Sequence, residues 1–257
     1  MNPTEYDDIN RLLADLLNRM RQTLGHKLVG LYLYGSLVWG DFDSDISDID
    51  LLALTEGDLD LEEFGRLDKM HRAFLQDYPR WDDRLEIAYY SVRGLQTFKT
   101  ARSPIAVISP GEPFNLKDAG YDWLINWYVV QEKGRKLYGP DFKTLIVPVS
   151  QQEFVAWVKA QVEEWREYVV HTRASRPYQA YTILTMCRAL RAVETGEQVS
   201  KKAAARWAQA RFPEKAGIIQ KALDWREDYR NQAVEPETTY PEAVNFVEFA
   251  ADFIKNK

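Results

Sequence analysis

Between two short apolar runs the chain reads GSLVWGDFDSDISDID, from Gly35 to Asp50. The run before it, residues 27–34, is rich in strand-forming residues, and the run after it, residues 51–54, is wholly apolar. Runs of this kind are typical of strands that are covered on both faces. The pattern therefore predicts two buried strands, 27–34 and 48–54, joined by an acidic loop that contains glycine.

Two carboxylates stand at the start of the second predicted strand. Asp48 and Asp50 are two residues apart, so on a strand they point to the same face and can share a divalent cation such as Mg²⁺. A third predicted strand, 84–90, carries Glu86 at a position where a structural role would call for an apolar residue. We therefore expect Asp48, Asp50 and Glu86 to form a metal site of the kind that in-line attack on a nucleoside triphosphate requires.

The end of the first predicted strand has features of a phosphate site. Glycine has no Cβ, so the backbone amides of Gly35 and Ser36 can approach phosphate oxygens, and the Ser36 hydroxyl adds a donor. A Gly-Ser pair on its own opens many loops without binding anything. Its place between a buried strand and the paired aspartates favours a role in binding phosphate.

The acids inside the loop have a different interpretation. Asp41, Asp43 and Asp45 imitate the opening of a calcium-binding loop. The imitation fails because Ile46 stands where that loop needs glycine, and Leu52 where it needs a bidentate glutamate. We interpret the three aspartates as solvated loop acids.

The rest of the chain predicts an α+β fold in two domains. Amphipathic helices are expected at 5–24 and 61–75, which with three strands makes a mixed β-sheet covered by helices. Residues 101–115 contain three prolines and a glycine and are interpreted as a loop, and 122–137 as a helix. From Ser150, a predicted helix cap, the pattern is helical throughout. We expect an N-terminal sheet domain, 1–149, and a C-terminal all-α bundle, 150–257.

Composition excludes several classes of protein. The 257 residues carry 39 acidic and 33 basic side chains, a formal charge of −6, which argues against a nucleic-acid-binding protein. With Cys187 as the sole cysteine no intramolecular disulfide can form. No stretch approaches 18 consecutive apolar residues, so we expect a cytoplasmic protein without membrane attachment.

Several motifs resemble one family over nearly the whole chain. The aminoglycoside adenylyltransferases that modify streptomycin and spectinomycin, members of the nucleotidyltransferase superfamily, have landmarks in register with residues 33–36, 47–52, 85–87, 137–140 and 184–207. By this resemblance Asp48 and Asp50 hold Mg²⁺, and Glu86 is the third carboxylate and the general base toward the acceptor hydroxyl. Ser36 and Ser47 would contact the triphosphate.

The resemblance also implies contacts to the nucleotide from other parts of the chain. Lys201 matches a lysine that reaches the phosphates, and Asp122 matches an acid beside the nucleotide. An aromatic contact falls on Tyr229 or Trp225. Without the family, Lys201 reads as a surface charge and Asp122 as an acid that favours the start of a helix.

The implied function is the Mg²⁺-dependent transfer of AMP from ATP to a hydroxyl of a small molecule, most simply an aminoglycoside, by a monomeric enzyme that releases pyrophosphate. In the family an acidic stretch recognises the cationic drug, but the matching segment here, 172–178, has two arginines and no carboxylate, so the acceptor stays open. Two alternatives remain: transfer to a protein side chain, and a regulator that senses ATP without transfer.

Overall fold

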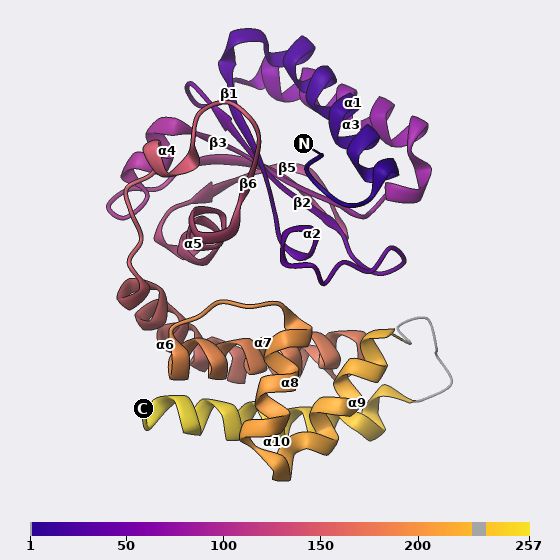
Figure 1. Ribbon diagram of the computed structural model, residues 1–257, viewed down its shortest axis with the longest axis vertical. Coiled ribbons are helices and arrows are strands. Elements are labelled where there is room, and N and C mark those ends of the chain that lie inside the picture. The colour runs from indigo at the N-terminus through magenta and orange to yellow at the C-terminus, as the bar shows by residue number, and fades with distance from the viewer. Residues whose placement is uncertain (1, 228–234) are drawn as a thin grey trace. The chain divides into compact units, whose positions relative to one another are not determined.

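The computed structural model describes residues 2–227 and 235–257. The chain divides into two compact units, Met1–Val149 and Ser150–Lys257, and each is described by itself (Figure 1).

The first unit is built on a six-stranded sheet in the order β5-β4-β3-β2-β1-β6. Strands β2 and β3 run parallel, and every other neighbouring pair is antiparallel. The sheet is therefore mixed, as predicted, and the α+β fold class is confirmed. The strands are β1 (Leu28–Tyr34), β2 (Ile49–Thr55), β3 (Leu85–Ser91), β4 (Ser103–Ser109), β5 (Glu112–Ala119) and β6 (Arg135–Tyr138).

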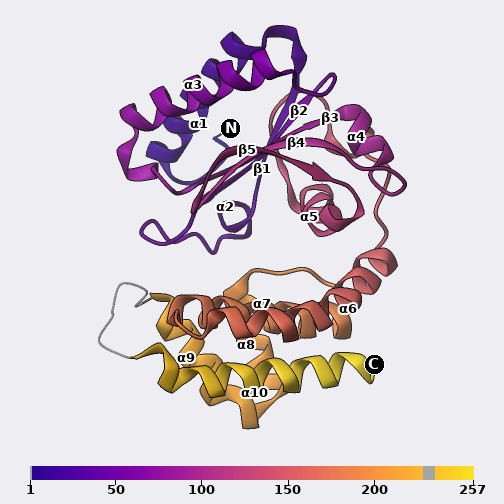
Figure 2. The same ribbon diagram turned by 180° about the vertical axis from the view of Figure 1, so that it is seen from behind.

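Helices cover both faces of this sheet (Figures 1 and 2). Helices α1 (Asp7–Leu24) and α3 (Leu61–Asp77) lie on one face, and α5 (Leu124–Lys133) and the short α2 (Ser36–Trp39) and α4 (Val92–Thr97) on the other. Helix α1 buries a leucine-rich stripe at spacings of three and four, and α3 begins with a capping box between Asp60 and Glu63. Single 3₁₀ turns are η1 (Gly25–Lys27), η2 (Pro79–Trp81), η3 (Tyr121–Trp123) and η4 (Phe142–Thr144).

The predicted loop 101–115 is wrong, because these residues form most of a β-hairpin, β4 and β5. The sheet tolerates these prolines because of where they lie. Pro104 precedes the first residue of β4 that pairs with β3, and Pro113 lies on β5, the edge strand. A proline without an N–H costs little where no partner strand needs that donor. Gly111, with φ of 79°, makes the turn.

The predicted helix 122–137 is too long. Helix α5 ends at Lys133, Gly134 caps it, and the next four residues form β6, which pairs antiparallel with β1. In the second unit, the last helix begins at Pro236 and contains a second proline, Pro241.

The second unit is a helical bundle centred on α7, which packs against α6, α8, α9 and α10. Ser150 caps α6 as predicted, Ser200 caps α8, and Gly196 in the left-handed conformation ends α7. The elements are α6 (Gln151–Tyr168), η5 (Val169–Thr172), α7 (Arg176–Thr195), α8 (Lys201–Arg211), η6 (Pro213–Lys215), α9 (Ala216–Glu227) and α10 (Pro236–Lys255). A search of the described residues finds no helix with the length and hydropathy to span a bilayer.

Candidate active site

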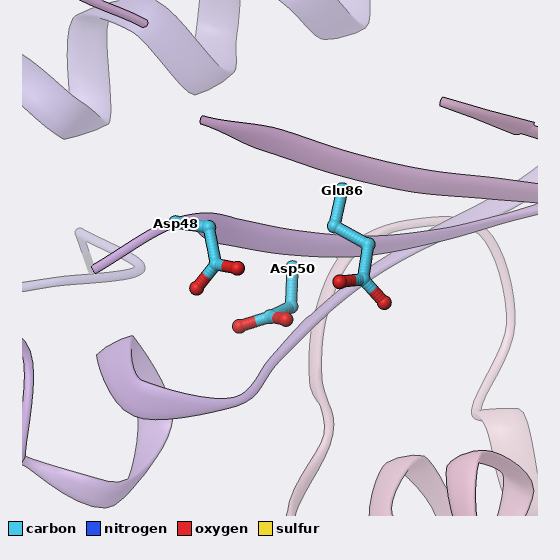
Figure 3. A group of neighbouring side chains, drawn as sticks. All are labelled: Asp48, Asp50 and Glu86. Atoms are coloured by element: carbon cyan, nitrogen blue, oxygen red, sulfur yellow. The ribbon is translucent and has the colours of Figure 1, made fainter. Parts of the chain in front are cut away.

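Three carboxylates converge at the start of β2 and β3. One carboxylate oxygen each from Asp48, Asp50 and Glu86 lies within 4.8 Å of the others, and all three side chains are partly buried (Figure 3). Asp50 and Glu86 are register partners in the parallel pair, so they share a face of the sheet. Asp48 lies directly before β2, rather than inside the strand as predicted. The fold thus brings together the three acids that the sequence pattern singled out.

The donor set fits a hard divalent cation. Carboxylate oxygens are the ligands that Mg²⁺ and Ca²⁺ prefer, and three negative groups this close repel one another unless a cation lies among them. Within residues 2–227 and 235–257 no second group of three His, Cys, Asp or Glu side chains meets the same spacing. This is therefore the place where a metal would bind.

Only glycine fits at position 35, where the backbone lies against the carboxylates. Its φ is +71°, and a Cβ built on it would lie 1.9 Å from Asp50 Oδ2. Any side chain here would push the carboxylate aside, in addition to the strain of the left-handed backbone. The sequence suggested that glycine at this position lets phosphate oxygens approach the backbone. In the structure, the close contact with the Asp50 carboxylate already requires it.

The two predicted serines differ in their contacts. Ser36 begins α2, and its Oγ is buried without a hydrogen-bond partner among the described residues, which suits a donor reserved for a ligand. Ser47 is buried, and its Oγ accepts the Asp43 N–H at 3.0 Å while its own N–H donates to the Asp43 carbonyl at 2.8 Å. Ser47 therefore closes the loop, and its hydroxyl proton is left for a further acceptor.

Tyr34 is a site residue that the sequence analysis missed. It is the register partner of Asp50 across β1 and β2, and its side chain is buried. Burial raises the pKa of the phenol well above its ordinary value, and the charges of Glu86, Asp50 and Asp48 raise it further. A neutral phenol therefore lies beside the carboxylates. The available signal was its position as the last strand residue before Gly35.

Asp122 does not join the carboxylate group. It is exposed on η3, where it accepts two hydrogen bonds from the Arg102 guanidinium, at 2.9 and 3.2 Å, and the Gly120 N–H at 2.9 Å. These bonds give it a structural role after β5.

The residues predicted in the second unit have their own surroundings. Lys201 is the first residue of α8, and its Nζ lies 4.5 Å from the centre of the Tyr181 ring, a cation–π distance. Trp225 is buried in α9. Tyr229 lies outside the described residues.

Comparison with known families assigns both units. Residues 13–99 match the family model of the nucleotidyltransferase domain, and residues 144–252 match that of the C-terminal domain of aminoglycoside adenylyltransferases. The chain is an aminoglycoside adenylyltransferase-type nucleotidyltransferase. The enzyme thus has the carboxylates within its nucleotidyltransferase match, and Lys201 and Trp225 within the other.

Solved structures resemble the enzyme in fold. The spectinomycin adenyltransferase AAD(9) from Enterococcus faecialis, solved with ATP and spectinomycin, superimposes with a TM-score of 0.70 at 18% identity, covering 93% of this chain and 98% of that one. A Shewanella oneidensis HEPN toxin and MNT antitoxin complex matches at 15% identity over 63% of this chain and 94% of that one, but its TM-score of 0.30 is too low to relate the folds. A search of curated proteins finds no significant match.

Proposed function

We propose that this enzyme transfers AMP from ATP to a hydroxyl of an aminoglycoside-type antibiotic, depends on Mg²⁺, and releases pyrophosphate. The observation that carries the proposal is the convergence of Asp48, Asp50 and Glu86 beside the turn at Gly35 and Ser36. The match of residues 144–252 to the C-terminal domain of aminoglycoside adenylyltransferases supports the acceptor class.

The three carboxylates would hold the metal, which when bound neutralises charge on the triphosphate. Glu86 would also take the proton from the acceptor hydroxyl, so that the oxygen can attack the α-phosphorus and displace pyrophosphate. The Ser36 N–H and Oγ would donate to phosphate oxygens at the end of β1. Tyr34, buried and neutral, would form a wall that adds no negative charge beside the nucleotide.

The remaining nucleotide contacts are also proposals. Lys201 would add positive charge for the phosphates, with the Tyr181 ring holding its ammonium group at the start of α8. Asp122 would act beside the nucleotide only after giving up bonds from Arg102. Either Trp225 or Tyr229 would supply an aromatic contact. Since ATP is an intracellular metabolite, we place the reaction in the cytoplasm.

The segment 172–178, which bears on the choice of acceptor, differs from the family pattern. Arg173 there forms an ion pair with Glu237 at 3.3 Å, and Arg176 is buried, at 5% exposure. The arginine charges are therefore engaged in the bundle, but the segment offers no carboxylate to a cationic drug. We expect acceptors that depend on that acidic contact, such as streptomycin, to react more slowly than spectinomycin.

The test is pyrophosphate release from ATP or GTP across a panel of aminoglycosides and other hydroxylated antibiotics. We expect release with ATP, Mg²⁺ and at least one drug, and a loss of about a thousandfold in Glu86→Gln with ATP binding retained. Full activity of Glu86→Gln would remove the base assignment. Label from ATP that appears in a protein band, with no drug modified, would instead support transfer to a protein side chain.

A further inference from the structure

Arg84 holds the chain on both sides of Asp48. Its guanidinium donates a hydrogen bond to the carbonyl oxygen of Ser47, the residue before Asp48. Its own carbonyl accepts the N–H of Ile49, the residue after Asp48, at 3.0 Å. Asp48 is thus bracketed by two bonds to one residue.

This bracket matters because Asp48 lies outside the sheet. The ladder between β2 and β3 begins with Ile49 opposite Leu85. The position of the Asp48 carboxylate therefore depends on the hydrogen bonds that hold the end of the loop. Hydrogen bonds from a charged donor to a carbonyl are among the stronger polar contacts available for this purpose.

The guanidinium of Arg84 is itself held in place. It lies 4.6 Å from the centre of the Trp81 ring, and Trp81 is buried and stacks on Phe42 of the loop at 6.3 Å. A planar guanidinium against an aromatic face loses little freedom when it makes a further bond. The segment from Trp81 to Glu86 therefore fixes the loop and supplies the third carboxylate.

We infer that Arg84 is a positioning residue, which sets the place of the Asp48 carboxylate relative to Glu86 and so tunes the affinity of the site for a divalent cation. The inference rests on the proposed function, since it requires that the carboxylates bind metal. Residues that orient metal ligands typically change metal affinity by about 10- to 100-fold when they are replaced.

Arg80 offers a matched control. It also faces Trp81, at 5.9 Å, and contacts the same loop, but at the Ser44 carbonyl (3.0 Å) and the Asp45 carboxylate (3.3 Å), which are farther along the chain from Asp48. A general loosening of the loop would follow from replacing either arginine. An effect on Asp48 itself would follow only from replacing Arg84.

The experiment is a titration of the full-length protein with Mn²⁺ alone, followed by the electron paramagnetic resonance signal of the free ion. We expect Arg84→Gln to weaken Mn²⁺ binding about tenfold, Arg84→Lys to recover part of that loss because it keeps one charged donor, and Arg80→Gln to bind like the wild type. Asp50→Asn should bind no Mn²⁺ at this site. Melting midpoints measured alongside show whether each variant is folded.

The outcomes separate the two ideas. Mn²⁺ binding that survives unchanged in Asp50→Asn would overturn the metal site of the proposed function, and this inference with it. Binding lost in Asp50→Asn but equal to wild type in Arg84→Gln would overturn only the role of Arg84. An equal loss in Arg80→Gln would also overturn it. If Arg84→Gln does not fold, Arg84→Lys is used in its place, and a Mn²⁺ affinity equal to that of the wild type in Arg84→Lys would overturn the role of Arg84.

Discussion

The two faces of β2 and β3 differ at the start of the strands: one contributes to stability and the other carries the candidate catalytic acids. Ile49, Leu51 and Ile87 face the core under α1 and α3, each with none of its surface exposed, whereas Asp50 and Glu86 alternate with them and point to the other face. The first face gains free energy by removing apolar surface from water, whereas the second gathers like charges that oppose folding at the start of the two strands. Neighbouring residues on one strand should therefore fail in opposite ways when replaced.

The largest effect is expected on the acidic face. Asp50→Asn removes one of three negative charges from the group, and we expect the rate of pyrophosphate release to fall about a thousandfold or more while the fold is kept. Activity and far-ultraviolet circular dichroism measured on the same sample check both parts. Asp45→Asn is the control, since it removes an exposed loop acid that is bonded to Arg80. Comparable losses in both variants would erase the distinction between loop acids and site acids.

The apolar face should show the reverse. Leu51→Ala, one residue further along β2, removes a fully buried side chain, and we expect the free energy of unfolding to fall by about 3 kcal/mol. Activity below the unfolding transition should stay within a few-fold of the wild type. Urea unfolding followed by circular dichroism gives the first quantity and pyrophosphate release the second. A folded Leu51→Ala without activity would show that the two faces are not separable.

The turn at Gly35 tests how closely the acidic face is packed. Gly35→Ala places a methyl group 1.9 Å from the present position of Asp50 Oδ2. Because the carboxylate must move, we expect activity to fall about a hundredfold, the usual cost of a displacement near 1 Å. The measurement is the rate of pyrophosphate release at saturating ATP.

Gly40→Ala is the matched control for that experiment. Gly40 ends the same short helix, α2, with φ of +69°, but apart from its chain neighbours no atom of the described residues lies within 4 Å of a Cβ built on it. It therefore carries the backbone strain without the collision. If both variants lose activity equally, strain in α2, and not contact with Asp50, explains the effect.

Local pattern was enough to predict that Asp48, Asp50 and Glu86 would lie together. Asp48 and Asp50 could be placed because alternation along a strand decides which side chains share a face, and Glu86 because an acid stands in a run of apolar residues. Their meeting depends on the register of β2 with β3, which pairs Asp50 with Glu86. That register was not visible in the sequence.

Other features were beyond local pattern. Prolines concealed β4 and β5, since whether a proline is tolerated depends on which neighbour needs its missing donor, and that is decided by the assembled sheet. The strand β6 follows α5 after a single residue, Gly134, and its four residues, Arg135–Tyr138, are too few to show a strand pattern of their own. Arg84 gave no signal at all, because a bond from a guanidinium to a distant backbone carbonyl leaves no periodic trace.

The smallest effect is expected from the one histidine within the apolar face. His71 of α3 is 1% exposed, and its Nε2 lies 2.7 Å from the hydroxyl of Tyr89 on β3. Burial lowers the pKa of His71 to about 4, and the nearby Asp68 opposes this only in part. The unfolded chain, with an ordinary pKa of about 6.5, therefore takes up a proton at a higher pH than the folded one. Stability is fully present above that pH and is lost as the pH falls toward 4.

From these pKa values the free energy of unfolding should drop by about 2 kcal/mol between pH 7 and pH 5 through His71 alone. His71→Gln, which keeps a group able to bond Tyr89, should flatten the dependence by that amount even if it is less stable at pH 7. Urea unfolding of both proteins at the two pH values measures the difference, with His26→Gln, at an exposed position, as the control. An undiminished drop in His71→Gln would mean that the acid sensitivity of this domain arises elsewhere. The carboxylates of the opposite face would then be the next groups to replace.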